Sequence, residues 1–201
     1  MVEVHAAGIV HRDLKPENVF LCPDEAVAPG QRVKILDFGI AKVPPKADGA
    51  GVDTLVQTDA PLLLGTSTYM APEQWRNPAE VDGRADVYSL GVMLFDLCAG
   101  RPPFVAEDRV DLITMHMRDE PPSLQDLAPA VPGALAAFVA SMLTKDPAER
   151  PTMARCQEML GLRWETAREK CPIPGLAPLA EAQAELFFAA MGADRGAEQR
   201  R

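Results

Sequence analysis

The chain has 201 residues, of which 47% are hydrophobic and 24% are charged, so it can fold around one core of ordinary size. Its net charge of −9 argues against nucleic acid or an anionic membrane surface as a partner, although a local phosphate site is still compatible with it. The sequence has neither a signal-peptide pattern nor a run of ~20 uncharged apolar residues, so no membrane segment is predicted.

The cysteine pattern predicts reduced thiols and a cytoplasmic protein. Cys22, Cys98, Cys156 and Cys171 are widely separated and form no C-x-x-C pair. This spacing is untypical of a disulfide framework or a zinc site.

The first part of the chain predicts one small hairpin between loops. Residues 1–10 read as the last turns of a helix, and residues 11–18 as a loop, because Pro16 fits neither a helix interior nor a central strand. Residues 19–22 and 33–36 are short apolar or alternating runs that predict two strands joined by a turn. Beyond them, a long stretch rich in proline, glycine and polar residues predicts an extended loop.

The second part of the chain predicts a bundle of helices. Residues 86–100 are apolar on nearly all sides, which is typical of a buried helix, and Gly100 followed by a proline pair would end it. Further helices are predicted at residues 106–118, 132–144 and 152–160. Near the end of the chain, residues 178–191 predict one amphipathic helix, either a capping helix or frayed tail, or a docking element.

The residues that carry chemistry are oxygen ligands and one cation at close spacing. Asp13 is followed by Lys15 and Asn18, and Asp37 comes directly after the second predicted strand. Carboxylate and amide oxygens suit Mg²⁺, and a carboxylate can also accept a proton. Phosphoryl transfer needs such groups more than it needs covalent catalysis.

Three motifs that follow one another in the chain make the prediction of phosphoryl transfer more specific. They are His11-Arg12-Asp13-Leu14-Lys15-Pro16-Glu17-Asn18, then Asp37-Phe38-Gly39, then Ala71-Pro72-Glu73. Over roughly residues 1–160 the chain resembles the eukaryotic-type serine/threonine protein kinases, including their bacterial members. The resemblance implies an α+β, mainly helical fold, namely the C-terminal lobe of a kinase with a small β-hairpin. It also implies a kinase domain over residues 1–163 and a tail over residues 164–201.

The resemblance implies roles for the residues of the catalytic and metal loops. Asp13 would accept the proton of the substrate hydroxyl, and Lys15 would contact the transferring phosphate of ATP. Asn18 and Asp37 would hold Mg²⁺, while His11, Phe38 and Gly39 would support these loops. The segment D-L-K-P-E-N around Lys15 is similar to that of kinases that phosphorylate serine and threonine of protein substrates.

Further residues are given structural or regulatory roles by the same resemblance. Glu73 and Arg150 would form a buried ion pair. Asp86 would hydrogen-bond the backbone near His11 and Arg12, although its position alone favours a helix N-cap. Phe20, with Leu21, would pack under the adenine, but a plain strand core explains these two residues equally well.

Arg12 would pair with a phosphorylated residue of the long loop. The candidate residues are Thr54, Thr58, Thr66 and Ser67, of which Thr54 and Thr58 are favoured.

One part of the kinase pattern is not found in these 201 residues. No Gly-rich phosphate loop and no V-A-I-K lysine precede the catalytic loop, and Lys34 lies in the wrong place for that lysine. We therefore expect the N-terminal lobe to be absent here, supplied upstream or by another chain, and we expect weak ATP binding and weak phosphate transfer by these residues alone. The alternative is a non-catalytic kinase remnant, or pseudokinase, that acts as a binding module. Chance motifs in an unrelated helical protein are a third reading.

Overall fold

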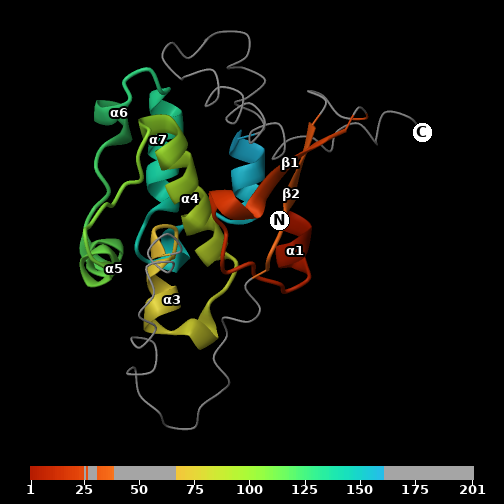
Figure 1. Cartoon of the computed structure of the whole chain (residues 1–201), viewed down its shortest axis with the longest axis horizontal. Coiled ribbons are helices and arrows are strands. Elements are labelled where there is room, and N and C mark those ends of the chain that lie inside the picture. Colours follow the sequence, from red (N-terminus) through yellow and green to blue (C-terminus); the bar gives the residue numbers. More distant parts are fainter. Residues whose placement is uncertain (25, 27–30, 39–66, 161–201) are drawn as a thin grey trace.

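The computed structural model describes residues 1–24, 26, 31–38 and 67–160, which form a mainly helical fold with a small antiparallel sheet beside it (Figure 1). The elements in chain order are α1 (Val2–Ala6), the 3₁₀ turn η1 (Pro16–Asn18), β1 (Val19–Pro23), β2 (Gln31–Ile35), α3 (Pro72–Arg76), η4 (Pro78–Glu80), α4 (Arg84–Ala99), α5 (Arg109–Arg118), α6 (Leu124–Leu127), α7 (Gly133–Met142) and η5 (Pro147–Glu149). Residues 153–160 are also helical. The predicted α+β, mainly helical composition is confirmed.

Helix α4 is the centre of the core. Every residue from Ala85 to Phe95 is buried, as expected for a helix that is apolar on nearly all sides. The helix ends where Gly100 adopts a φ of 72° and its N–H bonds the carbonyl of Asp96, a conformation that glycine reaches without a Cβ clash. The predicted helix at residues 86–100 is thus confirmed, with a start two residues earlier.

Helix α7 packs closely against α4 at a glycine. A β-carbon at Gly91 would lie 2.8 Å from Cβ of Met142 and 3.2 Å from Cδ2 of Leu143. The missing side chain therefore allows the two helices to approach each other in the densest part of the core.

The other predicted helices are present with shifted ends. The helix expected at residues 106–118 is α5, which begins only after Asp108, whose side chain accepts a hydrogen bond from the N–H of Asp111. The helix expected at residues 132–144 is α7, and residues 153–160 match the third prediction. Helix α6 was not predicted because it is only one turn long, although Ser123 caps it in the usual way.

The hairpin forms a single exposed layer. Strands β1 and β2 are antiparallel, with Val19 opposite Ile35 and Cys22 opposite Arg32, which confirms both predicted strands. Phe20 is 47% exposed and Leu21 is 37% exposed, so the reading of these residues as a strand core is wrong. Successive side chains of a strand point to opposite faces, and a two-stranded sheet has no second layer that covers both faces, so Phe20 and Leu21 are each partly open to solvent.

A buried ion pair joins α3 to the loop after η5. Arg150 donates to both carboxylate oxygens of Glu73, at 2.6 and 2.9 Å, as predicted. Its remaining N–H groups donate to the carbonyls of Thr144, Arg84 and Lys145. All five guanidinium donors are therefore satisfied on a side chain that is 0% exposed.

Arg84 completes the connection between α4 and η5. Its Nη1 donates to the carbonyls of Pro147, Ala148 and Arg150, at 2.9, 2.8 and 2.6 Å. Because Arg150 in turn donates to the carbonyl of Arg84 at 3.1 Å, each arginine side chain binds the other's backbone.

A second polar cluster lies beside Arg150, whose guanidinium carbon is 4.8 Å from the ring centroid of Tyr88. The hydroxyl of Tyr88 and Nδ1 of His116 are 2.9 Å apart, and Lys145 Nζ lies 4.4 Å from the ring centroid of Phe104. Burial, with a smaller contribution from Lys145, lowers the pKa of His116 to about 4. Burial also lowers the pKa of Lys145 to about 8, against the opposing charges of nearby acidic residues.

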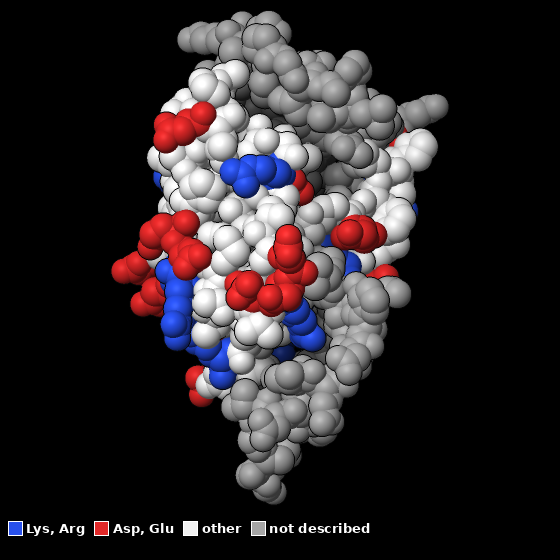
Figure 2. Space-filling view, turned by 60° about the vertical axis from the view of Figure 1, so that its left-hand side comes forward, with Lys and Arg blue, Asp and Glu red and all other residues white. Residues whose placement is uncertain are grey.

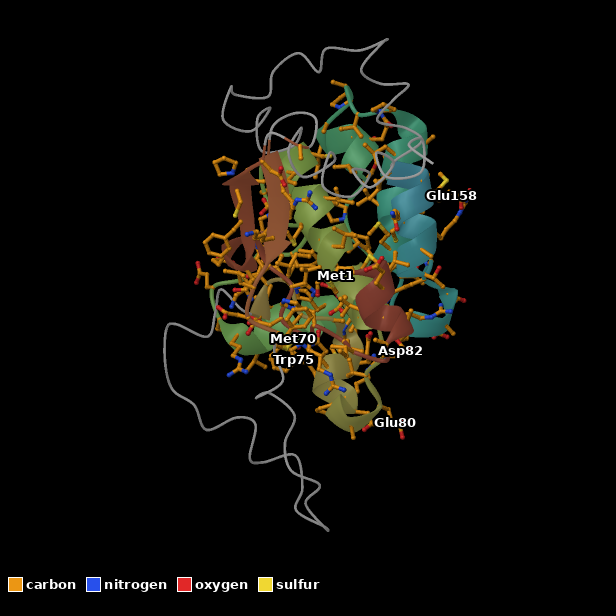
Figure 3. All side chains as sticks on the ribbon, turned by 90° about the vertical axis from the view of Figure 1, so that its right-hand side faces the viewer. Met1, Met70, Trp75, Glu80, Asp82 and Glu158 are labelled. Carbon is orange, nitrogen blue, oxygen red and sulfur yellow. The ribbon has the colours of Figure 1, made fainter. Side chains whose placement is uncertain are left out.

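The surface carries charges of both signs. On the face turned forward in Figure 2, acidic and basic side chains lie side by side. Glu158 projects outward from the helical residues 153–160 (Figure 3). Within the part of the chain that the structure describes, no helix is both long and apolar enough to cross a bilayer.

Candidate active site

The loop after α1 is tied to the core by one buried carboxylate. Asp86, which is 0% exposed, accepts hydrogen bonds from the backbone N–H groups of His11 and Arg12, at 2.9 and 2.8 Å. The predicted contact is therefore present. The N-cap reading is wrong, because Gly83 occupies that position and Asp86 lies inside the first turn of α4.

His5 on α1 is a third partner of this carboxylate, and the sequence did not reveal it. Its Nε2 lies 2.7 Å from Oδ2 of Asp86. The two residues are 81 positions apart, and no local pattern could have indicated the contact. The carboxylate thus connects α1, the loop and α4.

His11 joins the loop to the residues after β2. Its Nδ1 accepts a hydrogen bond from the N–H of Asp13 at 3.3 Å, so its Nε2 carries the proton and donates to the carbonyl of Leu36 at 2.9 Å. Its ring also contacts Phe38, with centroids 4.7 Å apart. The fully buried His11 therefore holds residues 11–13 against residues 36–38.

Asp13, Lys15 and Asn18, which the family resemblance assigned to one site, lie close together. Lys15 Nζ lies 3.2 Å from Asp13 Oδ2, and both side chains are mostly buried, at 18% and 12% exposure. Asn18 Nδ2 donates to the carbonyl of Asp13 at 2.8 Å and lies 3.4 Å from Oδ2. Because Asn18 turns its amide nitrogen toward Asp13, it would bind a cation through its amide oxygen.

The residue before Asp37 contacts this group through the backbone. The N–H of Leu36 donates to the carbonyl of Asn18 at 2.9 Å, so the chain leaves β2 directly beside the loop. Asp37 follows in the left-handed region, with a φ of 56°, and is exposed. Gly39, the last residue of this motif, is outside the described residues.

The donor set fits a hard cation in its chemistry. Asn18 and Asp37 offer an amide and a carboxylate oxygen, which are ligands that Mg²⁺ accepts together with water and phosphate. Among the described residues, no group of three or more His, Cys, Asp or Glu side chains is arranged to hold a metal ion. Asn18 and Asp37 are the residues that could contribute oxygen ligands to a metal ion here.

Arg12 lies beside Asp13 and contacts backbone carbonyls. Its φ is 64°, and its guanidinium donates to the carbonyls of Pro78 and Val81 at 3.2 and 3.3 Å. The predicted phosphorylation sites Thr54, Thr58 and Thr66 lie outside the described residues. Ser67 is described and is only 2% exposed.

Gln74 on α3 is a second contact that the sequence did not reveal. Its Nε2 donates to the carbonyl of Arg12 at 2.8 Å, and its Oε1 accepts from the N–H of Ala71 at 3.0 Å. The sequence signal was limited to the position of Gln74 three residues after Ala71, a spacing typical of a capping side chain.

Comparisons with known proteins agree with this arrangement. The family described as "Protein kinase domain" matches residues 1–164. The chain is 45% identical over 146 residues to serine/threonine-protein kinase Pkn1 of Myxococcus xanthus, an alignment that covers 73% of this chain and 20% of the relative. It is 38% identical over 154 residues to serine/threonine-protein kinase pkn3 of the same organism, covering 76% of this chain and 27% of the relative.

A third relative comes from another bacterium. Serine/threonine-protein kinase PknB of Mycobacterium leprae is 36% identical over 146 residues, covering 73% of this chain and 21% of the relative. The chain thus spans between about a fifth and a quarter of the length of these curated relatives. The family match and the assembled loops give the same result: this chain belongs to the protein kinase domain family.

Proposed function

We propose that the chain is the catalytic lobe of a serine/threonine protein kinase, which transfers the γ-phosphate of ATP to serine or threonine hydroxyls of proteins. The observation that carries the proposal is the mostly buried group formed by Asp13, Lys15 and Asn18 on a backbone that Asp86 holds. The residues 36–38 lie against this group through His11. The names of the bacterial relatives favour serine and threonine over tyrosine.

Each side chain suits one part of the transfer. The substrate hydroxyl oxygen bonds to the γ-phosphorus while the bond to the bridging oxygen breaks, and that electron pair leaves with ADP. The carboxylate of Asp13 takes the hydroxyl proton, and the ammonium of Lys15 offsets negative charge on the transferring group. Asn18 and Asp37 would hold Mg²⁺, which when bound neutralises phosphate oxygens.

The proposal includes the organisation of the protein. The kinase domain covers residues 1–163 and forms the C-terminal lobe, and residues 164–201 form a tail. A lobe that covers the nucleotide, in the same or another chain, would complete the ATP site, and the exposed Phe20 would contact the adenine from this side. The free thiols of Cys22, Cys98 and Cys156 support a cytoplasmic location.

The test is phosphate transfer to serine, threonine and tyrosine peptides. We expect weak transfer by the 201 residues alone and stronger transfer when the nucleotide-covering lobe of a bacterial relative is added. Asp13→Asn should lower the rate at least ~100-fold. Asp24→Asn is the matched control, because Asp24 also pairs with a cation, Arg32 at 2.6 Å, but lies on the hairpin.

The outcome separates this proposal from a binding module. Transfer that is lost in Asp13→Asn and kept in Asp24→Asn supports the kinase. A non-catalytic remnant would be supported if the unaltered chain and both variants, each with the added lobe, transferred phosphate at the same low rate.

A further inference from the structure

Gln74 connects two segments that meet beside the candidate catalytic residue. It lies in the first turn of α3, half-buried, and its amide bridges the carbonyl of Arg12 and the N–H of Ala71. Figure 3 marks Met70 and Trp75, which lie close to it in the sequence. Arg12 and Gln74 are 62 positions apart, so the bridge is a tertiary contact and not a local cap alone.

The two contacts of Gln74 require a side chain that has both an acceptor and a donor. Capping the N–H of Ala71 requires only an acceptor at position 74, and glutamate commonly serves in that role. The contact to Arg12 requires a donor, because its partner is a carbonyl oxygen. Only a side chain with both functions makes both contacts, and the amide of glutamine has them.

The carbonyl that Gln74 binds belongs to the peptide joining Arg12 to Asp13. Arg12 has a φ of 64°, a strained conformation for a residue other than glycine. The same peptide is held on its other side, where the N–H of Asp13 donates to His11 Nδ1 at 3.3 Å. The shorter bond is the 2.8 Å contact from Gln74, so it is the stronger restraint on the plane of this peptide.

We propose that Gln74 is a positioning residue that fixes the orientation of Asp13 through the carbonyl of Arg12. Rotation of this peptide plane changes the direction in which Asp13 leaves the backbone, and with it the carboxylate. Because the other end of the Gln74 amide binds Ala71, the orientation of Asp13 depends on whether the segment entering α3 is in place. The catalytic consequence rests on the function proposed above, whereas the structural consequence does not.

Two variants of Gln74 distinguish its proposed role in orienting Asp13 from its role in capping the N–H of Ala71. Gln74→Glu keeps the acceptor for Ala71 and loses the donor to Arg12, while Gln74→Ala loses both. Gln125→Ala is the matched control: Gln125 is also half-buried, and its Nε2 donates to the carbonyls of Pro129 and Val131, both at 3.1 Å, at the end of α6.

The first measurement is amide hydrogen exchange in the full 201-residue chain, read by NMR at Asp13 and Ala71. In Gln74→Glu, we expect exchange at Asp13 to rise about tenfold while Ala71 stays protected. In Gln74→Ala both amides should exchange faster, and in Gln125→Ala neither should change. Unchanged exchange at Asp13 in Gln74→Glu, in a folded protein, overturns the proposal and leaves Gln74 as a helix cap.

The second measurement is the split between kcat and the KM for ATP, with the nucleotide-covering lobe added. Gln74→Glu should lower kcat about tenfold at an unchanged KM, and Gln125→Ala should change neither. Faster exchange at Asp13 together with an unchanged kcat would overturn the positioning role. If the unaltered chain transfers no phosphate, the proposed function fails by itself, and the exchange at Asp13 still decides whether Gln74 orients this residue.

Discussion

Replacing Arg150 with methionine tests how much the Glu73–Arg150 ion pair contributes to stability. The substitution keeps much of the aliphatic stem and removes five hydrogen bonds, two to Glu73 and three to backbone carbonyls. The carboxylate of Glu73, 16% exposed, would be left without its cation. Breaking one member of a buried pair costs ~3–5 kcal/mol, which is a large part of the ~5–15 kcal/mol that stabilises a typical domain.

The assay is urea denaturation followed by tryptophan fluorescence in a Trp164→Phe background, so that the signal comes from Trp75, which lies two residues from Glu73 on α3. The matched control is Arg155→Met, because Arg155 pairs with Glu158 at 2.7 Å on the surface, where the side chains are 50% and 56% exposed. That pair should contribute less than ~0.5 kcal/mol. Glu73→Gln is a milder second variant, with an expected cost of ~1.5–3 kcal/mol from the lost charge-assisted bonds.

A free energy of unfolding for Arg150→Met within ~1 kcal/mol of that for Arg155→Met would refute the reasoning. It would mean that water or a shifted side chain replaces the lost donors. If Arg150→Met does not fold, the free energy of unfolding of Glu73→Gln can still be measured. A value equal to that of Arg155→Met would also refute the stabilising role of the Glu73–Arg150 pair.

Three further predictions concern how Lys145, His116 and Gly91 affect the stability of the helical core. Because the pKa of Lys145 is lowered to about 8, the unfolded chain binds more protons than the native one from pH 8 to 10.5, so this residue should make stability rise with pH there, by ~1–2 kcal/mol. Because the pKa of His116 is lowered to about 4, the stability that it contributes should be lost as pH falls from 6.5 to 4, by ~2–3 kcal/mol. Gly91→Ala should destabilise the protein by ~1–3 kcal/mol, despite the better helix propensity of alanine, because its Cβ would meet Met142.

Each of these has a variant or outcome that isolates it. The pH series is compared with Lys145→Met, since the partly buried thiol of Cys98 and the buried thiol of Cys156 have raised pKa values and act in the opposite direction above pH 9. A difference between the two proteins that does not vary from pH 8 to 10.5 contradicts the first prediction. His116→Gln should remove the acid-dependent loss, and an equal loss in both proteins contradicts the second. Gly91→Ala with unchanged or higher stability contradicts the third.

The sequence predicted the elements with strong local patterns and the contacts implied by known motifs. The helix at residues 86–100 was found because burial on all sides leaves a continuous apolar run. The Glu73–Arg150 pair and the contact from Asp86 to the loop backbone came from the family resemblance, since no periodicity connects such distant positions.

The errors and omissions have physical causes. Asp86 was also read as an N-cap because a carboxylate near a helix start usually caps it, but here its oxygens bind distant N–H groups. Phe20 was assigned a possible core role from its strand pattern, which does not tell whether a second layer covers it. The contacts of His5 and Gln74 were missed because polar partners 81 and 62 residues away arise only from the tertiary fold.

The exchange of backbone contacts between Arg84 and Arg150 links the evolution of two positions. Each guanidinium covers the main-chain oxygen of the other residue, so losing either side chain uncovers an acceptor at its partner's site. A substitution at either position therefore leaves an uncovered acceptor at the other, and a change of Arg150 also leaves Glu73 without its cation. Among homologous chains, the two arginines should therefore occur together, and the pair marks the junction of α4 and η5.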